Sequence, residues 1–408
     1  MKSKYITILA SILALTAWAD ITVSQDRSTG GGSNTITFLK PNTTLTITGN
    51  WDGLWNSPRV NFGDNYVYTE GDKVTVNITS NGSVSVEGAS NGSKLFGIDS
   101  QSPSKCDVYI TGAGYLSSNK SKIETFNSNQ NLFLDVNTNF VNTTYYIGSD
   151  ANGGSLTNTN LTITNTVELN NFILQEGSTL KLASDSDSSA ELYMTGKKDN
   201  VEYHSQIKGT LIQTGGIYQN YGRTQVYGTL DLSVEKGFMS NRLDLHNGST
   251  VIIKANNAIM ENETNILSTY NITGAKNTLK LYADQEFGYL RYGSNGAVVD
   301  AYTNGFDLTF NAIAFAQDGY TGTLNIFIED GYEWTNETIR FLTATVEQVE
   351  SILGSITING TAIDKSNWDI VSDGANGVFV NVAVPEPAEW AAIFGAIALG
   401  FVAYRRRK

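Results

Sequence analysis

The side chains with the most catalytic potential in this chain are two histidines. His204 and His246 are the only histidines, and they lie 42 residues apart. Each has an acidic residue two positions earlier, Glu202 and Asp244, which would share its face of a β-strand. One such neighbour arises readily by chance, so we interpret both histidines as surface or core-edge residues.

Paired carboxylates are the second chemical signal, because a glycosidase needs two of them roughly 5–9 Å apart. Asp185 with Asp187 and Glu329 with Asp330 do not stand out in a chain with 40 acidic residues. Adjacent residues of a strand point to opposite faces, which makes the second pair the poorer one. The stretch that begins at Asp185 lacks the central glycine and the distal glutamate of a calcium loop.

Other catalytic signatures are missing from the sequence. The Asn-Thr-Asp, Asp-Asp and Gly-His-Gly motifs of polygalacturonase-like enzymes do not occur, and neither does a phosphate loop, a nucleophile elbow or a zinc spacing. Cys106 is the only cysteine, which excludes an intramolecular disulfide, and we expect it to be a small buried residue. We therefore predict no catalytic residue, no metal and no cofactor, with a secreted β-helix polysaccharide lyase or glycoside hydrolase as the alternative.

The composition restricts the partners. The 408 residues carry a net charge of −13, which argues against binding to nucleic acid and to anionic membrane surfaces. Charged residues make up only 16% of the chain, so most of its polarity comes from Asn, Ser and Thr. This composition suits a protein exposed outside the cell.

Alternating apolar and polar residues predict β-strands through most of the chain. Asn-Gly, Gly-Gly and Ser/Asn clusters separate these segments, as at Asn81-Gly82 and Asn247-Gly248. The clearest predicted strands are 45–47, 74–78, 84–86, 132–136, 161–163, 180–182, 230–234, 279–281 and 324–328.

A recurring phrase places Ser or Thr after a turn and before a Leu- or Val-centred strand. The steps between neighbours include 19, 21 and 28 residues, which is the spacing of β-helix coils. The fold class predicted is thus all-β, a parallel β-helix or β-solenoid with end caps. A tandem β-sandwich is the alternative, because Asn-Gly turns such as Asn81-Gly82 are hairpin signals. The phrase is centred on Leu180, Leu211, Leu230, Val251, Leu279 and Leu324.

The body, residues 20–383, is similar to right-handed parallel β-helix surface proteins of the autotransporter-like type. Its tryptophans, Trp51, Trp55, Trp334 and Trp368, lie only near its two ends, as expected for caps over open coils. We predict a C-terminal cap over about 334–383. It would include a helix near 345–354, begun by a Thr345/Gln348 capping box and ended by Gly354.

Residues 1–19 have the pattern of a signal peptide. Lys2 and Lys4 precede a short apolar run, and the small residues Ala17 and Ala19 form the cleavage pattern for signal peptidase. The run is too short for an ordinary membrane anchor, so we expect cleavage after Ala19.

The other end, residues 384–408, combines a short motif, an apolar run and a basic tail. The motif Pro385-Glu386-Pro387 precedes the run 390–404, which we predict to be a single transmembrane helix. The basic residues that follow should stay cytoplasmic and leave the body outside. The anchor residues are Trp390, Gly395, Gly400 and Tyr404, and the basic stop is Arg405, Arg406, Arg407 and Lys408.

These last 25 or so residues resemble a PEP-CTERM sorting signal. The resemblance implies recognition by an exosortase-type membrane protease, cleavage near Pro385–Pro387, and an exopolysaccharide-producing bacterium of the Gram-negative type. The expected partners are signal peptidase, the exosortase-type protease, the inner membrane and exopolysaccharide. The expected function is that of a structural or adhesive protein of the cell surface, biofilm or extracellular matrix, anchored transiently in the inner membrane.

Overall fold

The alternating pattern of the sequence becomes strands that bury every second side chain. β4 (Thr43–Ile47) and β13 (Asn160–Ile163) both alternate buried and half-buried residues along their length. Strands make up most of the computed structural model, and the prediction of an all-β protein is confirmed. It describes residues 21–23, 27–28, 36–39, 41–52, 60–62, 69, 71–86, 93–94, 107–118, 122–124, 131–148, 159–184, 190–195, 197–198, 201–202, 204–260, 266–271, 274–332, 334, 339–372, 374, 377–382, 395, 399 and 405.

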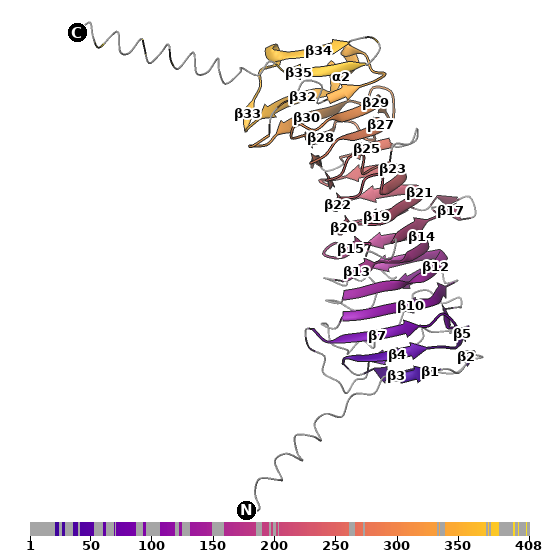
Figure 1. The fold of residues 1–408 in the computed structure, drawn as a ribbon. Helices are drawn as coiled ribbons and strands as arrows, with labels where there is room; N and C mark the ends of the chain where they lie inside the picture. The colour runs from indigo at the N-terminus through magenta and orange to yellow at the C-terminus, as the bar shows by residue number, and fades with distance from the viewer. Residues whose placement is uncertain are drawn as a thin grey trace, which may run out of the picture.

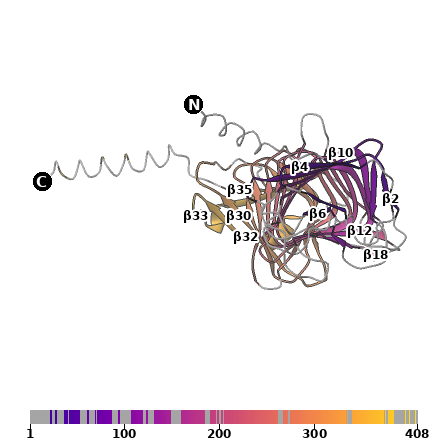
Figure 2. The same cartoon turned by 90° about the horizontal axis from the view of Figure 1, so that it is seen from below.

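Most strands belong to three ladders in which each strand pairs in parallel with strands earlier and later in the chain (Figure 1). In Figure 2 the stack is seen from one end, so that successive strands overlap. The first ladder contains, in order, β1 (Ile21–Val23), β4, β7 (Lys73–Ile78), the start of β10 (Asp107–Ser118), the start of β12 (Asn131–Ile147), β13, β15 (Thr179–Leu182), β20 (Thr210–Gln213), β22 (Thr229–Leu232), β24 (Thr250–Ile253), β26 (Asn277–Leu281), β28 (Ala297–Tyr302), β30 (Gly322–Ile328) and β32 (Leu353–Ile358).

The second ladder uses the segment that follows each strand of the first. At one point this ladder has a single isolated bridge, Phe238↔Ile259. There the side chain of Gln285 accepts a hydrogen bond from the N–H of Ile259 at 3.1 Å and donates one to its C=O at 3.0 Å. The members are β2 (Arg27–Ser28), β5 (Asn50–Asp52), β8 (Ser83–Val86), parts of β10 and β12, the starts of β14 (Thr166–Leu174), β21 (Ile217–Val226) and β23 (Phe238–His246), β16 (Glu191–Met194), the starts of β27 (Gln285–Tyr292) and β29 (Leu308–Phe315), and β31 (Ile339–Phe341).

The third ladder follows in the same way and is built largely from the second halves of long strands. Two short pairs lie beside the ladders: β3 (Ile36–Leu39) with β6 (Val60–Phe62), and β17 (Lys197–Lys198) with β18 (Val201–Glu202). The members are β9 (Ser93–Lys94), β11 (Lys122–Glu124), the ends of β12, β14, β21, β23, β27 and β29, β19 (His204–Ile207) and β25 (Ile266–Tyr270).

The core is a set of stacked aliphatic rows, one residue from each strand. Burial of each such side chain contributes about 1.5–3 kcal/mol. One row contains five of the six residues on which the recurring phrase is centred, and each of them is at most 1% exposed. The five pair in succession, in the order Leu180, Leu211, Leu230, Val251 and Leu279.

The sixth, Leu324, is displaced from this row. Leu279 pairs with Ala301, which in turn pairs with Ile326, whereas Leu324 pairs with Val299. The shift is two residues, so the inward face stays inward and all these side chains remain buried. The phrase therefore marks the inward face at Leu324, but not the same position in the ladder as in the other five.

The hairpin signal at Asn81-Gly82 does not produce a hairpin. β7 and β8, on either side of it, do not pair with each other; each pairs in parallel with β10. The turn moves the chain from the first ladder to the second, because Gly82 has no side chain to meet the carbonyl of Ile47. This correction removes the observation that favoured the β-sandwich.

Antiparallel strands gather at the C-terminal end. β34 (Trp368–Ser372) and β35 (Val378–Val382) pair antiparallel, β35 also pairs antiparallel with β31, and β33 (Thr361–Ala362) folds back on β32. Among the described residues, Trp51 is fully buried near the N-terminal end and Trp368 packs against the core from β34. Cys106 and Trp55 lie outside the described residues.

The predicted helix exists, with a different end. α2 (Val346–Ile352) has the expected capping box between Thr345 and Gln348. It ends before Gly354, because Leu353 already begins β32 and the strand ladder takes over the chain. A short 3₁₀ helix, Lys365–Asn367, precedes β34.

Within the described part of the chain, no helix combines the length and the hydropathy needed to cross a membrane. Of the predicted transmembrane segment 390–404, the description covers residues 395 and 399 alone.

Candidate functional site

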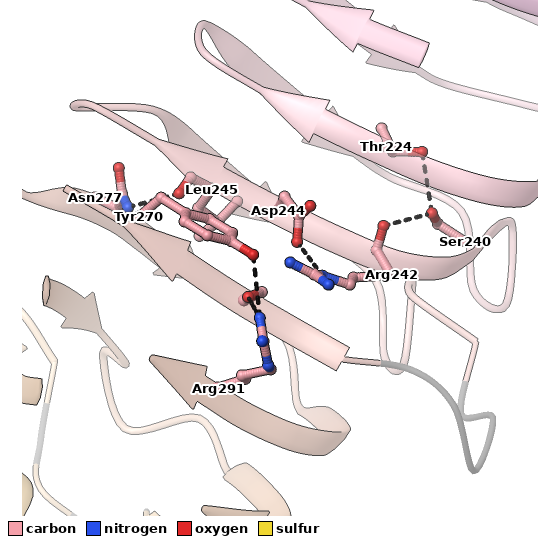
Figure 3. A network of polar contacts seen from close by, with 9 residues as sticks. Thr224, Ser240, Arg242, Asp244, Leu245, Tyr270, Asn277 and Arg291 are labelled. Atoms are coloured by element: carbon pink, nitrogen blue, oxygen red, sulfur yellow. Dashed lines mark hydrogen bonds and ion pairs between the residues drawn. The ribbon is translucent and has the colours of Figure 1, made fainter. Parts of the chain in front are cut away.

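The third ladder carries a group of arginines on its outer surface. Leu243, Leu245 and Leu267 point inward and are fully buried, so the residues that alternate with them point outward. The outward positions bring together residues from four successive strands in register. We call this surface the arginine face, and it consists of Arg223, Arg242, Asp244, Ser268, Tyr270 and Arg291. Figure 3 shows Arg242, Asp244, Tyr270 and Arg291.

Arg242 and Asp244 form an ion pair along strand β23. Arg242 Nε lies 2.5 Å from Asp244 Oδ1, and the two side chains are 14% and 1% exposed. The guanidinium carbon of Arg242 also lies 5.5 Å from the centre of the Tyr270 ring, a cation–π distance. The negative charge of the nearly fully buried Asp244 is thus neutralised by Arg242.

Arg291, on the third strand of the group, is held by neutral partners. Its Nη1 donates to Ser268 Oγ at 3.1 Å and to Tyr270 Oη at 3.0 Å. A guanidinium has five N–H donors, and these contacts use one nitrogen. In the part of the chain that the structure describes, no carboxylate forms an ion pair with Arg291.

A stack of three rings borders the arginines. Tyr227 directly follows β21, and His246 and Tyr270 end β23 and β25; the ring centres lie 4.5 and 4.8 Å apart and the ring planes are nearly parallel. Burial lowers the pKa of His246 below its ordinary value, while the nearby Asp244 acts in the opposite direction. The stack ends on Gly293, where a Cβ atom would lie 2.4 Å from the Tyr270 ring.

The outward side chains become small immediately beyond Arg291. The next strand, β29, places Ala312 opposite Tyr289 and Ala314 opposite Arg291. Both alanines are half-buried. The Arg291 side chain leans the other way, onto Ser268 and Tyr270 of β25.

A second polar group lies on the second ladder, around two tyrosines. The hydroxyls of Tyr193 and Tyr221 are 2.6 Å apart, and Gln219 Nε2 donates to Tyr221 Oη at 2.6 Å. The hydrogen bond with Tyr221 raises the pKa of Tyr193 to about 12. Tyr221 is 40% exposed, and the side chains of Tyr115 and Tyr282 are exposed to a similar extent. Exposed phenol rings with amide neighbours can bind sugars.

The predicted histidine–acid pairs have other partners. Asp244 bonds Arg242 rather than His246, whose Nε2 is buried without a hydrogen-bond partner among the described residues. The backbone carbonyl of His204 accepts from Asn171 Nδ2 at 3.1 Å. His204 is half-buried on β19, His246 is buried at the end of β23, and the side chain of Glu202 lies outside the description.

The acid pairs singled out in the sequence do not form a site in the described residues. Glu329 contacts Lys280 at 3.8 Å, and residues 185–189 lie outside the description. The description likewise contains no group of three or more histidine, cysteine or acidic side chains placed to hold a metal ion.

The sorting and cleavage residues cannot be compared with the structure, apart from Gly395 and Arg405. The others lie outside the described residues: Ala17, Ala19, Pro385, Glu386, Pro387, Trp390, Gly400, Tyr404, Arg406, Arg407 and Lys408.

Reasoning from the sequence missed the arginine face, although a signal existed. Arg223 and Arg242 are 19 residues apart, the same step that separates Leu211 from Leu230. If the 19-residue step is applied to charged residues as well as to leucines, Arg223 and Arg242 are predicted to be neighbours. It would not have found Arg291, because the steps that follow are longer.

Comparisons with protein-family models, with curated proteins and with solved structures found no match.

Proposed function

We propose that this chain is an exported structural and adhesive protein of the cell surface or extracellular matrix, whose body is a parallel β-helix that holds exopolysaccharide on its side. The export route is that of a signal peptide followed by exosortase-type sorting. The observation that carries the proposal is the arginine face, a rigid set of cationic and aromatic side chains in a chain of net charge −13.

The β-helix assignment is supported by the order of the three ladders. Between β12 and β29 the chain passes through the first, the second and the third ladder in turn and then returns to the first. The return takes 19 residues between Leu211 and Leu230 and 34 between Val76 and Ile110. Insertions at the corners account for such variation, since they leave the stacked rows unchanged.

The adhesive role is supported by what the outer surfaces display. Rows of outward side chains on a paired sheet are held in place before a ligand arrives, so little conformational entropy is lost on binding. Arginine nitrogens, tyrosine hydroxyls and amides are the groups that bind hydroxyl-rich and acidic polymers. An extended polymer can contact several coils at once, and the effective concentration then strengthens weak individual contacts.

The export steps are proposed from the ends of the chain. Signal peptidase would cut after Ala19, and segment 390–404 would hold the body outside the inner membrane until a membrane protease cuts near Pro385–Pro387. Mass spectrometry of the protein from culture medium and from membranes tests this route. We expect secreted molecules to end near Pro385, and an intact Lys408 in every fraction would overturn it.

A pair of variants makes that experiment specific. Replacing Pro385 and Pro387 together by alanine should keep the protein in the membrane fraction with its tail intact. The matched control, Val384→Ala, should be processed normally. Equal processing of both variants would show that the membrane protease does not recognise the Pro-Glu-Pro motif.

Binding is tested with exopolysaccharide purified from the producing cells. We expect the full chain to co-sediment with it, whereas an unrelated acidic protein should stay in solution. The double variant Arg223→Gln/Arg291→Gln should lose retention, and Lys254→Gln/Lys280→Gln, with the same change in charge on the first ladder, should keep it. Retention unchanged in the first variant would place the adhesive surface elsewhere, and shortening of the polymer would indicate an enzyme.

A further inference from the structure

We propose that a pocket in the C-terminal cap binds one ring of a neutral sugar. The pocket lies between α2 and β34, at the C-terminal end of the stack of coils (Figure 1). We call it the cap pocket, and it is lined by Glu350, Leu353, Lys365, Trp368 and Ile370. The inference rests on the proposed function for the choice of a sugar as ligand, and it adds a second binding site to that function.

The secondary structure around the cap pocket holds its walls in place. α2 buries Val349 and Ile352, so Glu350 on the same helix stays exposed. Trp368 and Ile370 alternate along β34 and therefore share one face of that strand, where both pack against the core. Because these walls are formed before a ligand arrives, little conformational entropy is lost on binding.

The size of the cap pocket limits the ligand to about one ring. Its volume is about 270 Å³, slightly below the roughly 300–1,000 Å³ of pockets that hold drug-sized molecules. Leu353, Trp368 and Ile370 provide an apolar surface that suits the C–H face of a pyranose. A row of several rings does not fit in this volume, so the pocket would take a terminal or branching residue of a polysaccharide.

Two opposite charges in the lining determine the class of sugar. Glu350 and Lys365 are both exposed, and neither forms an ion pair with another described residue. Lys365 Nζ lies 5.2 Å from the centre of the Trp368 ring, a cation–π distance. An ammonium only donates hydrogen bonds and a carboxylate only accepts them, whereas a hydroxyl does both. A neutral sugar can therefore bond both groups, while an acidic or an amino sugar is repelled by one of them.

The indole of Trp368 adds a donor that the protein itself does not use. Its Nε1 is buried and has no hydrogen-bond partner among the described residues. A buried N–H without an acceptor is unfavourable, so a ligand oxygen that reaches Nε1 gains a bond that the free protein lacks. This favours a ligand rich in oxygen over a purely apolar one.

Calorimetric titration of the full chain, purified from cells, tests the inference. Three neutral probes are methyl glucoside, methyl galactoside and methyl mannoside, and two charged ones are the acidic methyl glucuronide and the amine methyl glucosaminide. We expect at least one neutral glycoside to bind more tightly than both charged probes. Absence of binding by all three neutral glycosides, or tighter binding of a charged probe, would overturn the cap pocket.

The variant Glu350→Gln shows whether the carboxylate contacts the ligand. It should weaken the neutral glycoside about 5- to 10-fold, because a hydrogen bond to a charged group is stronger than one to an amide. It should also strengthen methyl glucuronide, since the repelling charge is gone while Lys365 remains. A structural defect would weaken both probes, so opposite changes identify a direct contact.

Glu347→Gln is the matched control, because Glu347 lies on the same helix but outside the lining of the pocket. It should bind every probe as the native chain does. A Glu350→Gln variant that also behaves as the native chain does would overturn the inference.

The space in the cap pocket is tested by filling it. Ile370→Trp should abolish binding of the neutral glycosides at unchanged thermal stability, because the larger side chain occupies the pocket. Val371→Trp, at the next residue of β34 on its other face, is the matched control and should bind normally. Binding retained by a folded Ile370→Trp variant would overturn the inference, and if that variant does not fold, the exposed Glu350 position decides.

The outcomes separate this inference from the proposed function. If no neutral glycoside binds while exopolysaccharide is still retained through the arginine face, the cap pocket is overturned and the adhesive role stands. If neutral glycosides bind but the full chain retains no exopolysaccharide, the adhesive role is overturned and the pocket stands as a site for small sugars.

Discussion

Arg242 Nε lies 2.5 Å from Asp244 Oδ1 on the outside of a strand, yet the Asp244 side chain is only 1% exposed. A carboxylate so far removed from water is stable only with its partner, because the cost of desolvating an unpaired charge is several kcal/mol. The pair is therefore a structural element of the arginine face, and it orients the Arg242 guanidinium over Tyr270.

The first prediction concerns this ion pair. Arg242→Met keeps an apolar stem but leaves Asp244 buried without its partner, and should lower the free energy of unfolding by about 3–5 kcal/mol. Lys254→Met is the control, because it breaks the more exposed pair with Asp231 and should cost less than about 1 kcal/mol. Urea denaturation measures both, and similar shifts would contradict the assignment of Asp244 as a buried charge.

The second prediction concerns Asn277, at the corner between the third and first ladders (Figure 3). Its Nδ2 donates to Leu245 O at 3.0 Å and Thr269 Oγ1 at 2.7 Å, and its Oδ1 accepts from Gly248 N–H at 3.0 Å. Asn277→Leu leaves these buried groups without partners and should cost about 2 kcal/mol or more.

Thr278→Ala is the matched control for Asn277→Leu. Thr278 is the next residue in the chain and points outward, half-buried. We expect its loss to change the melting temperature far less. A leucine at position 277 that is tolerated as well as the alanine at 278 would mean that the corner does not depend on the amide.

The third prediction concerns alkaline pH. Tyr145, Tyr218 and Tyr292 are fully buried, and burial raises the pKa of each above the ordinary value of 10.0. The folded state binds these protons more tightly than the unfolded state. The stability that the neutral phenols confer is therefore complete below about pH 10 and declines as the pH rises above it.

Ultraviolet absorbance of phenolate, followed together with far-ultraviolet circular dichroism, measures this effect. The buried phenols should ionise only as the β signal is lost. Tyr292→Phe should move the alkaline transition to higher pH, because the Tyr292 hydroxyl has no hydrogen-bond partner in the described structure. Ionisation of all tyrosines near pH 10 in a folded protein would contradict the burial.

The fourth prediction concerns corner glycines. A Cβ atom on Gly228 would lie 2.1 Å from the carbonyl oxygen of Gly209 in the preceding coil. Gly228→Ala should lower the free energy of unfolding by about 1–3 kcal/mol, because the backbone of one coil must move. Gly296→Asn is the control: its φ is +70° with nothing within 4 Å, and asparagine tolerates this conformation. Thermal melts compare the two.

Much of the local structure could be read from the residues. The strand at 161–163 lies within β13, and the Thr345/Gln348 capping box begins α2. The helix ends before Gly354, where the sequence predicts its stop, because Leu353 already pairs in the ladder. The hairpin signal at Asn81-Gly82, which favoured the alternative β-sandwich, produces no hairpin, because the pairing of β7 and β8 with β10 overrides the local turn preference.

The residues that are buried in most strands can be read directly from the amino-acid order, because alternation has the same period as the pleat of a strand. This order also determined a spacing of about one coil between Leu211, Leu230 and Val251. Which outward residues become neighbours depends on the folded ladders. Corner lengths differ from coil to coil, so Arg223, Arg242 and Arg291 meet on one face only after every preceding strand has taken its register.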